Sequence, residues 1–204
     1  MRIDRVVPKS SFLSVEKDSA IIASEILKNE RLKKYLVCNV KGVDPILDNY
    51  TITPKDESDL KEHIIKFAPK ITVDSPEFNY LVIKFNGFAP NLQNPEFRNN
   101  IIEFDIVCHF DHWKLPNFQQ RPFKIAAEID SMFNKKHLTG IGVLQFVSGD
   151  PFILTDEFGG FCLRYKAIHG EEDKTPMPTK EQEALLQETY YPGLLYYWMI
   201  YALL

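Results

Sequence analysis

Cysteine is scarce in this sequence of 204 residues, which contains only Cys38, Cys108 and Cys162, far apart from one another. An odd, widely spaced set does not indicate a disulfide framework, so a reducing compartment is the simplest interpretation. A basic excess is also missing, because 24 Lys and Arg against 28 Asp and Glu leave a net charge of −4. General duplex-DNA-binding proteins usually carry a positive surface, and this composition does not favour that class.

Long hydrophobic runs and targeting signals are missing as well. The first 14 residues contain no unbroken apolar core and no small-residue cleavage site, so the sequence does not predict a secretory signal. Residues 192–204 (PGLLYYWMIYALL) are almost wholly apolar, but a membrane-spanning helix needs about 20 such residues. The Tyr and Trp side chains in this run would also carry polar groups into lipid. We therefore expect no membrane association.

Motifs of nucleophilic catalysis and of phosphate binding are absent from the sequence. No G-x-S-x-G elbow occurs, and no cysteine lies in a context that indicates an activated thiol. The pairs Gly140 with Gly142 and Gly159 with Gly160 lack the lysine and the strand-to-helix setting of a phosphate loop, so both are predicted to be turns. The sequence therefore predicts a protein that is not an enzyme and that needs no cofactor.

One cluster combines residue types that bind metals, namely Asp105, Cys108, His109, Asp111 and His112. A structural zinc site needs two closely spaced ligand pairs, and no second cysteine or histidine pair occurs in the sequence. Strand alternation would also turn Cys108 inward and His109 outward. A buried thiol beside a solvated acidic edge is therefore the simpler interpretation, and metal binding is left open.

A second interpretation of the acidic residues is a metal-dependent nuclease. Phosphodiester cleavage of this kind needs two or three carboxylates that converge near a lysine. The sequence places no acidic pair next to a well-positioned lysine, and carboxylates on an exposed strand face commonly serve solubility alone. The residues that a nuclease site would require are spread over three segments: Glu103, Asp105, Glu128, Asp130, Arg164 and Lys166.

Residues 1–70 are predicted to be mainly helical. Apolar spacing and helix-start signals predict three helices, over 15–27, 29–38 and 58–67. Ser14 is the expected N-cap of the first helix. Pro54 and the acidic residues after it signal the start of the third, which is expected to end before Pro69. The segment 41–53, with its Gly, Pro and Asp-Asn pair, is expected to be a loop.

Residues 71–170 change to the two-residue period of β-strands, most clearly over 101–112. The segment 86–100, rich in Asn and Pro, is predicted to be a long loop, and 149–151 a turn. The order of elements is β-β-α-β-β-β, which indicates an α+β fold, a small antiparallel sheet with one helix packed on a face. The predicted strands cover 80–85, 101–112, 142–148, 152–155 and 161–169, and the helix covers 121–136.

Residues 171–204 are predicted to form a polar spacer, a helix over 179–189 and an aromatic docking tail. Tyr, Trp and Met are enriched at protein interfaces, so the tail is expected to bind a neighbouring protein or to pack on its own domain. The segment 86–100 is expected to be an arm that contacts a neighbouring subunit, because hairpin loops usually have about two to five residues. The expected interface residues are Phe88, Leu92, Phe97, Tyr190, Tyr191, Tyr196, Tyr197, Trp198 and Tyr201.

Residues 80–169 resemble the neck and tail-completion proteins of tailed phages, a group that includes tail terminators and connector ring proteins. The resemblance rests on a strand, a long hairpin loop, an outward-acidic strand (IIEFDIVCHFDHW), a helix that opens with Arg-Pro (RPFKIAAEIDSMF) and closing strands. The segment ILKNERLKKYL, followed by DP, is similar to leaders of phage neck-region proteins, including those of the crAss-like group.

This resemblance implies a structural virion protein, assembled in the host cytoplasm, that forms a ring in the phage neck or tail junction and connects portal to tail. Its partners would be copies of itself, in a sixfold or twelvefold cyclic assembly, and adjacent neck, portal or tail proteins. DNA would pass through with transient, non-specific contacts, which negative charge in the lumen favours. Glu103, Asp105 and Asp111 are the expected lumen-facing acids, and an outer solvated surface is the alternative.

Two other functional classes are left open by the residues. A monomeric protein-binding adaptor module would not self-associate at any concentration. A metal-dependent, nuclease-like enzyme would gain thermal stability from its metal, because a ligand that binds only the native state raises the melting temperature.

Overall fold

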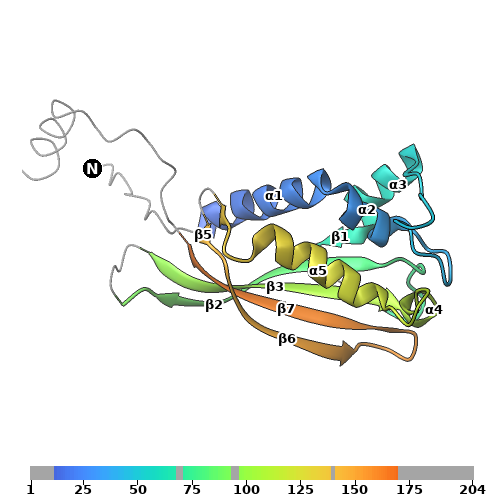
Figure 1. Ribbon diagram of the computed structural model, residues 1–204. Helices are drawn as coiled ribbons and strands as arrows, with labels where there is room; N and C mark the ends of the chain where they lie inside the picture. Colours follow the sequence, from blue (N-terminus) through green and yellow to red (C-terminus); the bar gives the residue numbers. More distant parts are fainter. Residues whose placement is uncertain (1–11, 68–70, 93–96, 139–140, 170–204) are drawn as a thin grey trace, which may run out of the picture. The chain divides into compact units, whose positions relative to one another are not determined.

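A five-stranded sheet with helices on one face forms the centre of the fold (Figure 1). The computed structural model describes residues 12–67, 71–92, 97–138 and 141–169. The chain divides after Glu171 into two units, and all the described residues belong to the first. Within it the strand order is β1-β2-β3-β7-β6. The predicted α+β class, with an antiparallel sheet and a helix packed on it, is confirmed.

The four long strands are β2 (Tyr80–Pro90), β3 (Arg98–His109), β6 (Gln145–Ile153) and β7 (Phe158–His169), and each pairs antiparallel with its neighbours. The short strand β1 (Ile65–Lys66) adds to β2 in parallel. As the alternation predicts, β3 turns Ile102, Phe104 and Ile106 into the core and Glu103 and Asp105 to the other face.

Three helices cover the apolar face of the sheet: α1 (Phe12–Lys28), α2 (Glu30–Val37) and α5 (Arg121–Phe133) (Figure 1). Helix α2 begins where the sequence predicts, because the Asn29 side chain accepts a hydrogen bond from the Leu32 amide. Helix α1 begins before its predicted start, so Ser14 lies inside the helix and does not cap it.

One hydrophobic core joins these helices to the sheet. Phe104 lies at its centre, stacked on Phe133 of α5 and edge-on to Tyr165 of β7, with ring centroids 5.1 and 5.8 Å away. The core includes Ile22 of α1 and Leu36 of α2. Residues on both sides of position 70 therefore share one core.

The C-terminal end of α2 is held by two buried side chains from distant parts of the sequence. Arg121, which is fully buried, donates hydrogen bonds to the backbone carbonyls of Tyr35, Val40, Val43 and His112. The Asn79 side chain donates to carbonyls of the same end of the helix: those of Tyr35, Leu36 and Cys38. The bonds to Tyr35, Leu36 and Cys38 satisfy carbonyls that the end of a helix leaves without intrahelical partners, and Arg121 also ties this end to the loop at Val40 and Val43.

The helix predicted over 58–67 is wrong in both its start and its end. Thr53 and Asp56 form a reciprocal capping box, so α3 (Pro54–Asp59) begins at Pro54. It continues as a π-helix, η1 (Leu60–Ile64), and Ile65 then leaves the helix to pair with Leu81. Because β1 pairs with the edge of the sheet, the helix ends at Ile64, before its predicted end at Phe67.

The long loop predicted over 86–100 is strand at both of its ends. A β-bulge between Asn86 and Ala89, with Gly87 at a φ of 62°, absorbs the residues that resemble a turn, and the ladder between β2 and β3 then continues to Pro90 and Arg98. The connection is reduced to residues 91–97.

Two predicted turns in the C-terminal half of the sheet are also strand. Gly149-Asp150-Pro151 lies inside β6, where proline is tolerated because β6 is an edge strand. Gly159 and Gly160 lie inside β7. A Cβ on Gly160 would overlap the carbonyl oxygen of Ile106, so glycine permits the close approach of β3 and β7.

Smaller differences concern the ends of two elements. The strand predicted over 101–112 ends at His109, and its last residues form the short helix α4 (Phe110–Trp113). Helix α5 ends at Phe133, and a small hairpin of β4 (His137–Leu138) and β5 (Gly142–Val143) follows it.

No helix in the described ranges has both the length and the apolar character that crossing a membrane requires. The spacer, the helix predicted over 179–189 and the docking tail lie outside the described residues.

Candidate functional site

The face of the sheet away from the helices carries a row of charged side chains across four strands. Lys84 on β2 pairs with both Glu103 and Asp105 on β3, at 3.1 Å from the Glu103 carboxylate. Arg164 on β7 binds the other Glu103 oxygen at 2.8 Å and reaches Asp150 on β6 at 2.6 Å. The five side chains form one continuous network of opposite charges.

The strand register explains this network. Glu103 lies directly opposite Lys84 on one side and Arg164 on the other, so each pair is a cross-strand neighbour. Partial burial favours the neutral form of Glu103, but the hydrogen bonds from Lys84 and Arg164 outweigh it and lower the pKa of this carboxyl. Burial likewise opposes the charge of Lys84, and the two carboxylates outweigh it and raise its pKa.

The predicted acidic strand face is therefore charge-paired. Glu103 and Asp105 share a face as expected, but each side chain is only 14% exposed and each has a cationic partner. Asp111 does not belong to that face, because it lies on α4 and pairs with Lys41 at 3.0 Å. The strand ends at His109, so alternation no longer places Asp111 in line with the other two acids.

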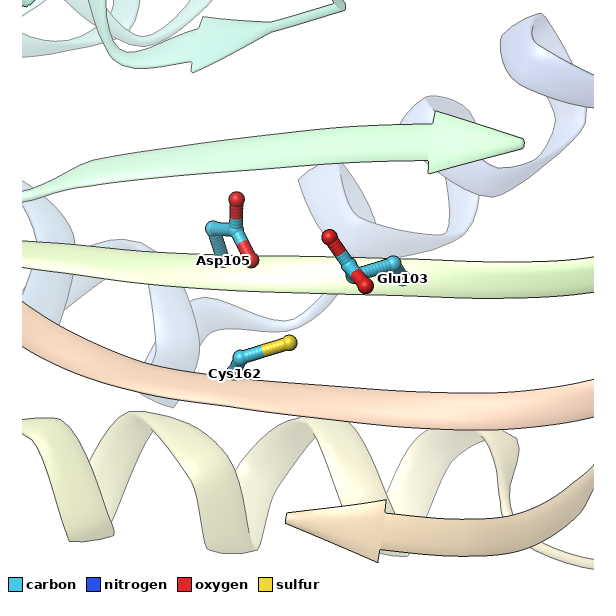
Figure 2. Close-up of side chains that lie close together, drawn as sticks. All are labelled: Glu103, Asp105 and Cys162. Atoms are coloured by element: carbon cyan, nitrogen blue, oxygen red, sulfur yellow. The ribbon is translucent and has the colours of Figure 1, made fainter. Parts of the chain in front are cut away.

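Cys162 on β7 brings a thiol to the same network, which the sequence did not predict. Figure 2 shows Glu103, Asp105 and Cys162 close together on β3 and β7, and their ligand-type atoms lie within 4.8 Å of one another. Burial, followed by a hydrogen bond to Asp105, raises the pKa of the thiol above its ordinary value. A metal ion would have to deprotonate this thiol and displace Lys84 from Asp105. The arrangement of these side chains therefore favours ion pairing over metal binding.

The metal-type residues that cluster in the sequence are divided between the two faces of the sheet. Cys108 is fully buried in the core under the helices, and burial raises its pKa to about 12. His109 lies on the other face against Phe158, with ring centroids 5.2 Å apart. His112 is buried on α4, and burial, with the positive charge of Arg121, lowers its pKa.

The carboxylates of the nuclease interpretation do not meet either. Glu128 and Asp130 lie on α5, on the helix side of the sheet, whereas Glu103 lies on the opposite side. Glu128 pairs with Arg31 at 2.8 Å, and Asp130 accepts a hydrogen bond from the Tyr165 hydroxyl at 2.9 Å. Each carboxylate thus has its own partner in a different part of the fold.

The arm residues of the sequence prediction have different surroundings. Phe88 is half-buried on β2 and packs edge-on against Phe12 of α1, with centroids 5.0 Å apart. Phe97 is half-buried as well, whereas Leu92 is 97% exposed. The tail residues Tyr190, Tyr191, Tyr196, Tyr197, Trp198 and Tyr201 lie outside the described residues.

Exposed apolar side chains gather on β6 and just beyond it, a feature that the sequence analysis missed. Phe146 and Val147 lie at one end of the strand and Ile153 and Leu154 at the other, and Ile153 is 79% exposed. The turn predicted over 149–151 divided this segment into two short strands, so its character as one long edge strand was not visible. Within the described part of the sheet, no strand pairs with its outer side.

An open groove lies between β6 and helix α5. Its volume is about 240 Å³, and its lining is mostly apolar but includes two polar side chains. Its lining residues come from α5, β6, β7 and the residue that follows α5: Ala126, Ala127, Asp130, Asn134, Phe146 and Leu163.

Residues 29–167 match the model of the YomW family, which derives from a Bacillus phage. The match covers well over half of the chain, and the chain therefore belongs to the YomW family. No curated protein matches the chain. The protein is thus phage-associated, which confirms the predicted resemblance at that level.

Proposed function

We propose that this protein is a non-enzymatic structural component of the phage particle, which assembles with copies of itself into a ring at the neck or tail junction. The observation that carries the proposal is β6, an edge strand with exposed apolar side chains at both ends. Sheet edges are normally protected by charges, because they pair readily with other chains. On β6 such protection is confined to Asp150, Pro151 and the bulge between Phe146 and Ser148, and the apolar end at Ile153 lacks it.

The sheet also has a second open edge, at β2, which could pair with the β6 edge of another copy. Strand β1 covers only Leu81 and Val82 of β2, so residues 83–90 have no partner on that side within the described ranges. Three antiparallel pairings separate β2 from β6, so these two strands run in opposite directions. A copy added in the same orientation would place its β2 antiparallel to β6 of its neighbour.

Contacts between two different edges are heterologous, and repeated heterologous contacts close into rings or extend into filaments. This supports the predicted cyclic assembly of copies around a channel that DNA traverses. A lumen formed by the charged sheet face would present Glu103 and Asp105 already paired with Lys84 and Arg164. DNA phosphates would then meet mixed, immobilised charges, which favour transient contact.

The first experiment is the solution mass of the purified protein, measured by light scattering and native mass spectrometry over a hundredfold concentration range. We expect a discrete sixfold or twelvefold species. The Ile153→Ser variant should shift the protein toward monomer, whereas Leu47→Ser, which changes another exposed apolar residue far from β6 in the sequence, should not. A monomer at every concentration would overturn the proposal and favour a monomeric adaptor module.

The aromatic tail has a separate proposed role in docking onto the adjacent neck, portal or tail protein. Deletion of residues 190–204 should leave a folded protein that still forms the ring but no longer binds that neighbour. Circular dichroism and co-sedimentation with phage particles lacking this protein measure the two properties. Loss of folding would instead assign the tail to the protein's own core.

A further inference from the structure

A tight turn between α4 and α5 exposes a phenylalanine in a strained backbone conformation. The Gln119 amide donates to the Pro116 carbonyl at 3.2 Å, and the Leu115 amide donates to the Gln119 carbonyl at 2.9 Å. The two central residues, Asn117 and Phe118, have φ angles of 56° and 59°. Turns with two positive φ angles favour Asn followed by Gly, and a bulky residue in the second position is strained.

The isolated protein does not explain why phenylalanine occupies this position. The Phe118 side chain is 94% exposed, so it gains almost nothing from packing. Glycine would relieve the backbone strain and remove an apolar ring from water. Strained backbone and exposed aromatic rings are both typical of binding sites, where an aromatic side chain fills a pocket on a partner.

The groove between α5 and β6 is a pocket of the corresponding kind on the same chain. Ala126, Ala127 and Leu163 give it a mainly apolar lining, and Phe146 provides an aromatic wall. Phe118 precedes the start of α5 at Arg121. The first residue of α5 that lines the groove is Ala126, between one and two helical turns after that start. Phe118 does not line the groove of its own chain.

The charges beside these two features are complementary. Lys114 is exposed and lies at the base of the turn, where its backbone forms an isolated antiparallel β-bridge with that of Gln120. The Asp130 carboxylate at the groove accepts hydrogen bonds from Tyr165 and Asn134. Among the residues that the structure describes, neither Lys114 nor Asp130 has an oppositely charged partner. A second copy would bring the lysine toward the carboxylate when its turn enters the groove.

We infer that Phe118 of one copy inserts into the α5–β6 groove of the next copy, with Lys114 directed toward Asp130. The inference rests on the proposed self-assembly and names one of its contacts. The inserted turn and the groove are different surface patches, so the contact is heterologous and propagates from copy to copy.

The test compares Phe118→Gly, which removes the inserted ring, with Ala127→Arg, which fills the groove from an exposed position on α5. Each should weaken self-association at least about 30-fold in sedimentation velocity, as expected for loss of a central aromatic contact. The melting temperature of the Phe118→Gly protein should be unchanged or higher, because the turn loses its strain. Leu47→Ser is the matched control and should leave both quantities unchanged.

A photo-crosslinking amino acid at position 118 tests the contact directly. Irradiation should join two copies, and mass spectrometry should locate the crosslink in residues 126–134 or 145–148 of the second copy. Crosslinks elsewhere, or unchanged association of both variants while the wild-type protein still assembles, would overturn this inference and leave the proposed function standing. A wild-type protein that is monomeric throughout would overturn both.

Discussion

Strand β3 pairs on both sides, with β2 and β7, whereas β6 pairs with β7 alone. One face of β3 packs under the helices and the other carries paired charges, and its sequence alternates accordingly. Strand β6 contains Gly149 and Pro151 and exposes apolar residues at both ends. The contrast shows that hydrophobic alternation reports burial on both sides of a strand within one chain, and that it is lost on the edge strand β6.

The largest expected difference between the two strands concerns their aromatic residues. Phe104→Ala on β3 should lower the free energy of unfolding by about 3–5 kcal/mol, because it empties the site between Phe133 and Tyr165. Phe146→Ala on β6 should cost only about 1 kcal/mol, because that ring is 47% exposed and loses one edge-on contact, with Tyr165. Urea denaturation measures both. Equal losses would mean that β6 belongs to the core as much as β3 does.

Gly160→Ala tests the tight contact between β3 and β7 and should cost about 3 kcal/mol or more, since a Cβ there has no space beside the Ile106 carbonyl. The control is Gly42→Ala, where φ is 72° and no atom lies within 4 Å of a Cβ. That control should cost about 1 kcal/mol, from the backbone conformation alone. Thermal unfolding followed by circular dichroism separates the two. Similar losses would contradict the steric explanation.

The charged face of β3 gives a smaller, pH-dependent effect. Glu103→Gln should destabilise the protein by about 1 kcal/mol at pH 7, because Lys84 and Arg164 lose their shared carboxylate. The pKa of Glu103 is lowered in the folded state, so its contribution is complete above its ordinary value and lost as the pH falls through the lowered one.

Urea denaturation at pH 7 and pH 3 measures this dependence, and the difference between the wild type and the Glu103→Gln protein should shrink at the lower pH. Glu16→Gln, on an exposed position of α1, is the control. A difference that persists unchanged at pH 3 would show that the effect of Glu103 does not come from its charge.

The smallest expected effect on stability belongs to β6. Ile153→Ser should change the free energy of unfolding by no more than about 0.5 kcal/mol, because the side chain is already in water. The same variant should lose self-association in the light-scattering experiment. A large loss of stability without a change in association would assign Ile153 to the protein's own fold.

Predictions from the sequence succeeded where burial of one face gives the sequence a regular spacing of apolar residues. They failed where pairing between strands overrides the turn preference of Gly and Pro. The helix near Asn29 and the alternation around Phe104 were predicted correctly. Gly87, Pro151 and Gly160 were interpreted as turn residues, yet they lie in a bulge, an edge strand and a close strand contact. Local composition does not distinguish a turn from a bulge, an edge strand or a close strand contact, because pairing with the neighbouring strand determines which of these forms.

The charged site was predicted only in part, for a related reason. Alternation placed Glu103 and Asp105 on one face, but their cations come from strands before and after β3. The register between strands, which the sequence does not give, determines that Lys84 and Arg164 lie opposite Glu103. The thiol of Cys162 beside them depends on the same register. Strand pairing thus converts an acidic pattern into a network of paired charges.

The buried Arg121 also has a consequence for the order in which the protein folds. Its acceptor at Tyr35 lies 86 residues away in the sequence, and the acceptors at Val40 and Val43 lie 81 and 78 residues away. Bonds across such separations form only after large chain loops have closed. Amide hydrogen exchange in α2 and in α5 should therefore slow together, as one cooperative unit, and the N-terminal helices should gain protection only when the sheet is complete.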